Sequence, residues 1–325
     1  LKEAGELALE LEKQNIPVTI SKMSSRLSPP GLWRLRRLFI HQKLDIVHTH
    51  MYRSNTSGTI AAKLAGVPVI VNNIHNVDSW DNNRQIRTDR IVSRLRDCTI
   101  LVSKGVAADY MAKVPIDIEK SRVIYNGVDT DFFKPGDSTF LQHNGLIVGA
   151  AARLMPQKGL ENMVKAAAEQ EFKDQNVKFV IAGDGPLKQN LMQQAEELNA
   201  TSNFKILGFI SEIRDFYRSI DIFAMPSLKE GFSNALVEAM ACGAAPVVTD
   251  VGGNGEAVQD GYNGRLVPSN NYPAFKTALS EMITSFDKRR MYSENSLRTV
   301  QRFSLDTMAD QTMELYLTLL RKMRK

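Results

Sequence analysis

The sequence has little cysteine and no long apolar run, and each shortage excludes a class of protein. Only Cys98 and Cys242 occur in 325 residues, each within an apolar stretch, so we expect buried free thiols rather than a disulfide. No apolar run reaches the ~18 residues that a membrane-spanning helix requires. The chain opens without an initiator Met, a basic n-region or a cleavage site, so no signal peptide is visible and we expect a cytoplasmic protein.

Positive charge is only slightly in excess, with a formal net charge of +5 and a pI near 9.1. Nucleic-acid binding does not follow from so mild an excess. Basic residues gather in GLWRLRRLFIHQK (31–43), where Arg34, Arg36, Arg37 and Lys43 stand among Leu, Trp, Phe and Ile. We interpret this segment as an ordinary amphipathic surface helix. The alternative is a helix that lies on an anionic membrane surface or receives an anionic lipid, which would make the protein peripheral at the inner membrane face.

Short β-branched runs alternate with helical stretches along the chain, and 43% of the residues are apolar. The expected strands of the first series are 18–20, 45–48, 68–71, 99–102 and 123–125. Those of the second series are 146–150, 178–182, 205–207, 222–225, 246–249 and 265–267. Repeated strand–helix–strand units predict an α/β protein with parallel sheets that helices cover on both faces.

A segment rich in Pro, Gly and Asp (126–145) separates the two series and predicts two Rossmann-like domains, 1–140 and 141–304. The remaining residues, 305–325, read as an amphipathic helix. The chain begins with a helix that feeds a strand, whereas a doubly wound domain begins with a strand and a glycine-bearing loop. We therefore expect the first domain to lack that strand and loop.

The segment KEGFSNALVEAMACGAAPVV (229–248) holds two carboxylates, Glu230 and Glu238, eight residues apart. We expect Glu230 in the loop after a buried strand, where open α/β sheets bind ligands. Ser233 is the expected N-cap of the next helix, and Glu238 lies inside that helix among apolar residues. A buried carboxylate needs donors, which either the two adjacent hydroxyls of a ribose or a neighbouring Arg or Lys would supply.

Groups suited to phosphate occur at two places. The backbone N–H groups of Asn234, Ala235 and Leu236 stand at the expected helix start, where anions bind. The sequence RLMPQKG places Arg153 and Lys158 in the loop after the first strand of the second domain. Two cations on one short loop repel each other unless an anion joins them, and a diphosphate leaving group is such an anion. The alternative is a pair of solvated surface cations.

The segment EGFSNALVE (230–238) is similar to the E-x7-E signature of the retaining GT-B glycosyltransferases of family 4. The likeness extends over 221–268 nearly end to end. It continues through VSKGV and VIYNGVDTDFFKP (102–135), AARLMPQKGL (151–160) and IAGDGPL (181–187), and so covers most of the chain. The resemblance implies a GT-B fold, in which two Rossmann-like domains face each other across a cleft. The acceptor would bind the first domain, the nucleotide sugar the second, and the last helix would pack back on the first.

The resemblance also implies roles for single residues. Glu230 would hold hydroxyls of the donor sugar and Glu238 the nucleotide ribose, while Arg153 and Lys158 would hold the diphosphate. His75 would touch the transferred sugar, the alternative being a loop histidine with local partners only. The remaining nucleotide contacts would come from Gly231, Phe232, Ser233, Asn234, Ala235 and Leu236, with Gly208, Phe209 and Ile210 along the nucleobase. In VGGNGE (251–256) Glu256 would either reach the sugar or be structural, and His50 would line the acceptor side.

Two patterns raise the question of a metal. The sequence DTD imitates the D-x-D of metal-dependent sugar transferases, but Asp129 and Asp131 follow an Asn–Gly turn that the resemblance identifies as structural. His48, His50 and His75 could hold zinc, yet no Cys or carboxylate completes the set. The Arg–Lys loop already supplies positive charge. We therefore expect a metal-independent enzyme without a cofactor.

The predicted function is transfer of a sugar from a nucleoside diphosphate sugar, UDP being the usual nucleotide of the family, to a hydroxyl with retention. No residue is a convincing nucleophile, so the family implies a front-face substitution in which the departing phosphate oxygen takes the acceptor proton. The expected acceptor is a carbohydrate or a lipid-linked saccharide in bacterial cell-surface polysaccharide or glycolipid synthesis. The alternatives are a catalytically silent sugar-nucleotide-binding partner protein and another GT-B sugar-nucleotide enzyme, such as an epimerase.

Overall fold

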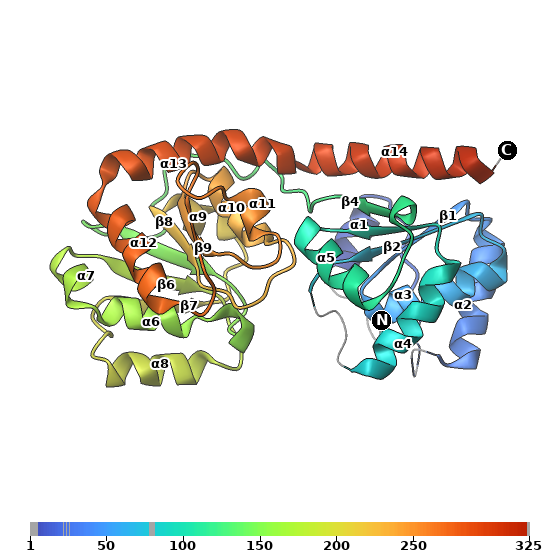
Figure 1. The fold of residues 1–325 in the computed structure, drawn as a ribbon, viewed down its shortest axis with the longest axis horizontal. Helices are drawn as coiled ribbons and strands as arrows, with labels where there is room; N and C mark the ends of the chain where they lie inside the picture. The colour runs from blue at the N-terminus through green and yellow to red at the C-terminus, as the bar shows by residue number, and fades with distance from the viewer. Residues whose placement is uncertain (1–5, 22, 24, 26, 78–81, 324–325) are drawn as a thin grey trace. The chain divides into compact units, whose positions relative to one another are not determined.

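The computed structural model describes residues 6–21, 23, 25, 27–77 and 82–323 (Figure 1). The chain divides into two units that interleave along the sequence. Unit 1 comprises the chain up to Val102, Ala107–Ile124 and the chain from Thr312. Unit 2 comprises Ser103–Val106 and Tyr125–Gln311. Each unit is a parallel sheet with helices, which confirms the predicted α/β class.

The sheet of unit 1 has four parallel strands in the order β1-β2-β3-β4. The strands are β1 (Ile46–His50), β2 (Val69–Ile74), β3 (Cys98–Leu101) and β4 (Ser121–Val123). The α-helices are α1 (Glu6–Lys13), α2 (Pro29–Gln42), α3 (Tyr52–Ala65), α4 (Asn83–Val92), α5 (Lys104–Lys113), whose first turn belongs to unit 2, and the last part of α14. Every residue of β3 is buried, as expected for a strand that is covered on both faces.

The predicted strand at residues 18–20 is wrong, because residues 16–21 form no helix or strand. A β-branched run becomes a strand only when a neighbouring strand pairs its backbone N–H and C=O groups. Within the described ranges, β1 pairs only with β2. The other predicted strands are confirmed, with their ends shifted by a few residues.

The sheet of unit 2 has six parallel strands in the order β10-β9-β8-β5-β6-β7. The strands are β5 (Ile147–Ala151), β6 (Lys178–Ala182), β7 (Phe204–Gly208), β8 (Ile222–Met225), β9 (Ala245–Thr249) and β10 (Arg265–Val267). The α-helices are α6 (Glu161–Ala168), α7 (Gln170–Asp174), α8 (Lys188–Glu197), α9 (Ile213–Arg218), α10 (Asn234–Ala241), α11 (Asn254–Ala257), α12 (Tyr272–Thr284), α13 (Phe286–Thr299) and the first part of α14 (Leu305–Met323). Short 3-10 helices at Ser93–Leu95, Ile118–Lys120, Pro156–Lys158 and Val300–Phe303 complete the elements of the two units.

The core of unit 2 explains why its strands read as short apolar runs. All residues of β8 and β9 are buried. Phe179 of β6 packs in one cluster with Phe172 of α7 and Phe275 of α12, and each of the three rings is almost completely buried. Helices on both faces of a parallel sheet require apolar side chains at successive positions, not at alternate ones. This rigid sheet carries the loops described below.

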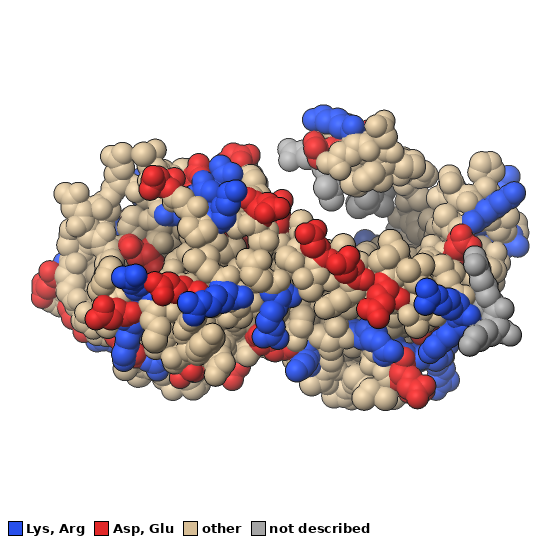
Figure 2. Space-filling model, turned by 90° about the horizontal axis from the view of Figure 1, so that it is seen from above, with Lys and Arg blue, Asp and Glu red and all other residues tan. Residues whose placement is uncertain are grey.

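Both cysteines are free and buried, as predicted. Burial raises the pKa of Cys98 to about 11 and that of Cys242 to about 12, so neither thiol is poised to react. Figure 2 shows Lys and Arg interspersed with Asp and Glu on the face that it draws. Within the described ranges, no helix combines the length and the apolar content needed to cross a bilayer.

Candidate functional site

Five loops of unit 2 follow neighbouring strands and therefore gather at one edge of the sheet. The strands β9, β8, β5, β6 and β7 are adjacent in that order and parallel, so their carboxyl ends lie at the same edge. Ligands of open α/β sheets bind at this edge. The predicted donor residues Arg153, Lys158, Glu230 and Gly208 all lie in or beside these loops.

Arg153 lies just after β5, in a loop that the loop after β6 holds in place. Gly183 has φ of +146°, and a Cβ atom there would lie 1.9 Å from the carbonyl oxygen of Ala152. The backbone N–H of Leu154 donates to the carbonyl oxygen of Asp184 at 2.9 Å. The Arg153 side chain is exposed and makes no hydrogen bond or ion pair with any described residue. It is therefore available to an anion.

Lys158 and Glu230 are brought together by the loops after β5 and β8. Lys158 Nζ lies 2.7 Å from Glu230 Oε1, and the two side chains are 18% and 9% exposed. Ser227 Oγ donates to the same oxygen at 2.6 Å. The predicted phosphate ligand and the predicted sugar ligand thus form one partly buried ion pair. Sequence reasoning missed Ser227, although a hydroxyl three residues before Glu230 in the same loop was a usable signal.

Glu238 lies on α10 and is hydrogen-bonded to a tyrosine. Tyr217 of α9 donates its hydroxyl to Glu238 Oε2 at 2.8 Å. Burial raises the pKa of Glu238, and the tyrosine hydroxyl partly opposes that rise. Within the described ranges no Lys or Arg forms an ion pair with this carboxylate. The sequence alternative of an Arg or Lys partner is therefore not found there, and nothing in the sequence pointed to Tyr217.

The first turn of α10 has the predicted cap. Ser233 Oγ accepts a hydrogen bond from the backbone N–H of Leu236 at 3.4 Å, which confirms Ser233 as the N-cap. The side chain of Asn234 is exposed and accepts from Asn126 Nδ2 at 3.1 Å. Gly231, Phe232 and Leu236 are buried and Ala235 is partly buried. The helix start therefore offers backbone N–H groups to a ligand more than it offers side chains.

The loop after β9 fixes the backbone beside Glu230. Gly252 has φ of +57°, and a Cβ atom there would lie 2.1 Å from the carbonyl oxygen of Glu230. The backbone N–H of Gly253 donates to the carbonyl oxygen of Gly231 at 2.7 Å. Ser103 Oγ donates to that same oxygen at 3.0 Å. The position of Glu230 thus depends on a close backbone approach that only glycine permits.

Glu256 uses both carboxylate oxygens within the protein. Its oxygens accept from the backbone N–H groups of Lys104 at 2.9 Å and Gly105 at 3.0 Å. The Tyr125 hydroxyl donates to Glu256 at 2.8 Å. Burial and this hydrogen bond raise the pKa of Tyr125 to about 12. These contacts favour the structural interpretation of Glu256 over contact with a sugar.

The predicted nucleobase residues form the end of β7 and its loop. Gly208 has φ of +82°, and its carbonyl oxygen accepts from the backbone N–H of Gly183 at 2.7 Å. The Phe209 side chain is 81% exposed, and Ile210 is partly buried. An aromatic ring with so much exposed surface is free to stack on a base.

In unit 1, three histidines cluster at the carboxyl ends of β1 and β2. His50 Nδ1 and His75 Nε2 are 3.0 Å apart, and the rings of His48 and His50 are 4.3 Å apart. The Tyr316 hydroxyl of α14 lies 2.5 Å from His48 Nδ1. The buried Nε2 of His48 has no hydrogen-bond partner among the described residues.

The environment of this histidine cluster favours the uncharged rings. Burial, together with smaller contributions from the neighbouring His50 and His75, lowers the pKa of His48 to about 4. Burial also lowers the pKa values of His50 and His75. A cavity of about 520 Å³ lies beside the cluster, lined by residues of β1, α2 and α3 that include His48 and His50.

Asp129, a candidate metal ligand in the sequence, is part of a turn. Its Oδ1 accepts from the backbone N–H groups of Asp131 at 3.0 Å and Phe132 at 2.9 Å. Such an Asx turn gives the carboxylate a structural role. Across residues 6–77 and 82–323, apart from single undescribed positions, no group of three His, Cys, Asp or Glu has the arrangement of a metal site.

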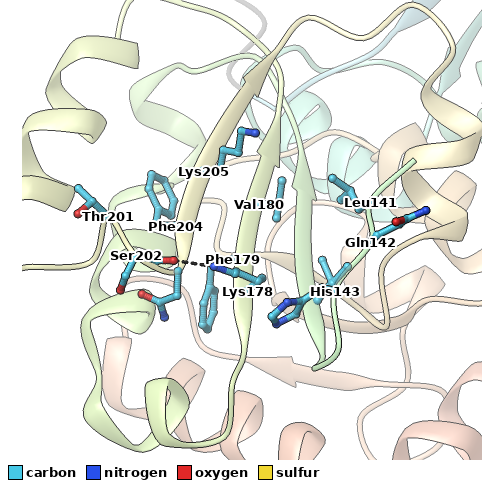
Figure 3. Close-up of a pocket in the computed structure, with 12 residues that line it drawn as sticks. Leu141, Gln142, His143, Lys178, Phe179, Val180, Thr201, Ser202, Phe204 and Lys205 are labelled. Carbon is cyan, nitrogen blue, oxygen red and sulfur yellow. Dashed lines mark hydrogen bonds between the residues drawn. The ribbon is translucent and has the colours of Figure 1, made fainter. Parts of the chain in front are cut away.

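A separate cavity of about 380 Å³ lies at the opposite end of the sheet of unit 2 (Figure 3). It is lined by the first residues of β5, β6 and β7 and by the preceding segments, which include His143, Lys178 and Lys205. Lys178 Nζ donates to the carbonyl oxygen of Ser202 at 2.6 Å. None of the predicted site residues lines this cavity.

Family profiles match most of the chain. The profile described as "Glycosyl transferases group 1" matches residues 137–299. The profile described as "Glycosyltransferase Family 4" matches residues 3–132.

Individual relatives are similar over most of their length. One relative is UDP-Gal:alpha-D-GlcNAc-diphosphoundecaprenol alpha-1,3-galactosyltransferase of Escherichia coli. The two sequences are 28% identical over an alignment of 340 residues, which covers 97% of this chain and 87% of that protein. The glycosyltransferase MJ1178 of Methanocaldococcus jannaschii is 30% identical over 268 residues, 80% of this chain and 72% of that protein. The crystal structure of Anabaena Alr3699/HepE in complex with UDP has a TM-score of 0.87 at 24% identity, covering 98% of this chain and 90% of that chain. This last likeness identifies the fold as GT-B.

Proposed function

The chain belongs to the group 1 glycosyl transferases, and from that premise we propose that it transfers a sugar from UDP-sugar to a hydroxyl with retention. The observation that carries the proposal is the set of loops at the carboxyl edge of the unit 2 sheet. These loops combine a free guanidinium, a Lys–Glu pair and a capped helix start. Retention rests on the resemblance of residues 230–238 to the E-x7-E signature.

Arg153 and Lys158 would bind the diphosphate of the donor. Negative charge grows on the leaving diphosphate as the glycosidic bond breaks, so cations fixed at that position stabilise the transition state more than the ground state. Arg153 is free to do so, whereas Lys158 is paired with Glu230 at 2.7 Å. An arriving diphosphate would share or take over Lys158. The released carboxylate oxygen would then accept hydroxyls of the donor sugar.

Glu238 would accept the ribose hydroxyls. Tyr217 occupies one of its carboxylate oxygens at 2.8 Å, and the other has no partner among the described residues. That second oxygen is the one that we assign to the ribose. The ring of Phe209, 81% exposed, is available to the base.

The chemical step needs no residue as a nucleophile. In the proposed front-face substitution the bond from the anomeric carbon to the diphosphate breaks, and the acceptor hydroxyl bonds to the same face. Its proton passes to the departing phosphate oxygen. His75, held by His50 at 3.0 Å, would orient the sugar and the acceptor as a neutral ring. We propose that the reaction uses neither metal nor cofactor.

The relatives supply the finer part of the proposal. The E. coli relative is named for UDP-galactose and a diphosphoundecaprenol-linked acceptor, and the Anabaena structure contains UDP. We therefore propose UDP as the nucleotide and a lipid-linked saccharide of cell-surface polysaccharide synthesis as the acceptor. Gly208 and Ile210 would contact the base through their backbone.

Release of UDP tests this proposal. The chain would be mixed with UDP-glucose or UDP-galactose and a panel of lipid-linked saccharides in EDTA, and the anomeric configuration of the product would be read by NMR. We expect an acceptor-dependent release of UDP and an α-linked product from an α-linked donor. Donor binding without turnover on any acceptor would favour the silent binder. Conversion of the donor without an acceptor, to a new sugar nucleotide, would favour the epimerase.

A further inference from the structure

The solvent-exposed face of α2 carries apolar and basic side chains. An ordinary surface helix carries charged side chains of both signs on this face. Trp33 is 57% exposed and Ile40 is 46% exposed. These residues stand seven positions apart, so they lie on one face of the helix, and the exposed Arg37 stands between them. The opposite face of the helix is used for packing, since Gly31 and Leu35 are shielded there. Exposure of a tryptophan and an isoleucine in the same stripe calls for a partner.

Arg36 connects this stripe to the end of α3. Its guanidinium lies 4.8 Å from the centre of the Trp33 ring. Its Nε also donates to the carbonyl oxygen of Leu64 at 2.9 Å. Leu64 is itself 58% exposed and follows the exposed Lys63. We define the α2 face as Trp33, Arg37, Ile40, Lys43 and Leu64.

The charge around the α2 face fixes the chemistry of its partner. Residues 13–77 contain nine Lys and Arg but only one acid, Asp45. Their net charge of +8 exceeds the +5 of the whole chain, so the rest of the chain is slightly acidic. The positive charge is therefore local to the segment that carries α2 and α3. A partner with complementary charge must be anionic.

We propose that the α2 face docks on an anionic lipid bilayer, with the helix lying in the plane of the interface. A tryptophan and aliphatic side chains beside arginine and lysine are the combination that interfacial helices use, the apolar groups entering between headgroups and the cations binding phosphate. A nucleic acid would use the cations but leave Ile40 and Leu64 without a partner. The inference goes beyond the proposed reaction and does not depend on it, because docking requires neither donor nor acceptor.

Vesicle binding tests the proposal directly. The full chain would be sedimented with vesicles of phosphatidylcholine alone and with vesicles of phosphatidylcholine and phosphatidylglycerol. We expect binding to the mixed vesicles only, weakened by added salt as the charges are screened. The chain has two tryptophans, so a Trp80→Phe background leaves Trp33 as the single reporter. We expect its fluorescence to shift to the blue and to lose acrylamide quenching on the mixed vesicles.

Matched variants separate the contribution of the α2 face to vesicle binding from the effect of the net charge of the protein. Arg37→Glu with Lys43→Glu would weaken binding roughly tenfold or more, since each basic residue near an anionic surface contributes on the order of a fivefold change in affinity. Arg84→Glu with Arg87→Glu makes the same change of charge on the exposed surface of α4 and should leave binding nearly unchanged. Far-UV circular dichroism and the release of UDP without vesicles would show that both variants remain folded.

Three outcomes would overturn the proposal. The first is no binding of the wild type to mixed vesicles above the level with phosphatidylcholine. The second is an equal loss of binding in the α2 and α4 variants, which would show a general charge effect. The third is a Trp33 that stays fully quenchable on vesicles but becomes protected as the protein concentration rises, which would identify the α2 face as a contact between two copies of the chain.

Discussion

Arg153 is the simplest test of the donor site at the scale of single residues, because its side chain makes no hydrogen bond or ion pair with a described residue. Its removal should therefore change catalysis without changing the fold. We expect Arg153→Ala to lower kcat about 100- to 1,000-fold with a smaller change in KM for the donor, as a lost transition-state donor does. Steady-state UDP release measures this. Lys205→Ala removes an exposed cation from the opposite edge of the same sheet and serves as the control. Equal kinetics in wild type and Arg153→Ala would contradict the diphosphate role.

Glu238 gives a prediction in pH. Its pKa is raised by burial, so the carboxylate takes up a proton at a higher pH than a solvated glutamate does. Ribose hydroxyls donate to the ionised form, and UDP affinity should therefore fall as pH drops through this raised pKa. Calorimetric titration of UDP across this pH range would measure the effect. In Glu238→Gln affinity should be weak throughout, and the pH dependence should shrink to that of UDP itself. A pH profile identical to that of the wild type would remove Glu238 from the site.

The sequence predicted where the candidate site residues lie in the fold better than it predicted their contacts. Glu230, Lys158 and Arg153 could be found because each lies in a loop directly after a strand. The contact of Tyr217 with Glu238 joins two helices with a strand between them, and no periodicity relates them. Likewise, the ion pair between Lys158 and Glu230 spans 72 residues and depends on the order of the strands, which local pattern does not determine.

At the scale of elements, substitutions at two glycines test whether the loop after β9 positions Glu230. Gly252 and Gly261 have similar φ of +57° and +73°, but a Cβ atom at Gly261 would meet nothing within 4 Å. Alanine at Gly261 should lower the free energy of unfolding by about 1–2 kcal/mol through backbone strain. Alanine at Gly252 should lower it by more, because its Cβ would also clash with the backbone of Glu230. Only Gly252→Ala should also lower kcat, about tenfold or more, because its Cβ would displace the backbone of Glu230. Denaturant unfolding and UDP release measure the two effects. Equal kinetics in both variants would contradict this account of the loop.

His48 of β1 should make the free energy of unfolding depend on pH. The folded pKa of His48, about 4, lies below the unfolded value of 6.5, so the folded state binds fewer protons between these values. Stability is therefore complete above pH 6.5 and falls as the pH drops towards 4. The charged or titratable neighbours are His50, His75 and Tyr316. We expect a loss of about 3 kcal/mol from His48.

Urea unfolding of wild type and His48→Asn at neutral and acidic pH checks this expectation. The variant should lose less stability on acidification than the wild type. His41→Asn, at an exposed position on α2, is the control and should behave as the wild type does. The expectation fails if His48→Asn loses as much stability as the wild type.

Prediction of strands succeeded where a strand is buried on both faces. It failed where the formation of a strand depends on pairing with a neighbouring strand. The runs that form β6 and β8 are apolar at nearly every position, and this pattern identified them. Residues 18–20 have the same β-branched character but pair with no described strand, and they form none. Sequence pattern reports propensity, whereas a strand also needs a neighbour.

At the scale of the whole molecule, the predicted donor residues all belong to one unit. Unit 2 also includes Ser103–Val106, a segment that lies far from the rest of unit 2 in the sequence. The hydrogen bonds of Ser103 to Gly231 and of Glu256 to Lys104 and Gly105 account for this membership. The sequence predicted the boundary between the two Rossmann-like domains after residue 140 and a last helix from residue 305, because a linker is visible in composition. Such long-range hydrogen bonds are not visible there.

Calorimetric titration of the chain with UDP in EDTA tests the central claim most directly, with GDP and ADP as matched competitors. The account predicts that UDP binds without a metal and more tightly than either competitor, and that Arg153→Ala with Lys158→Ala reduces its affinity at least tenfold. Binding that requires added Mg²⁺ would contradict the assignment of the diphosphate to these two cations. Absence of binding by all three nucleotides would contradict the donor site itself.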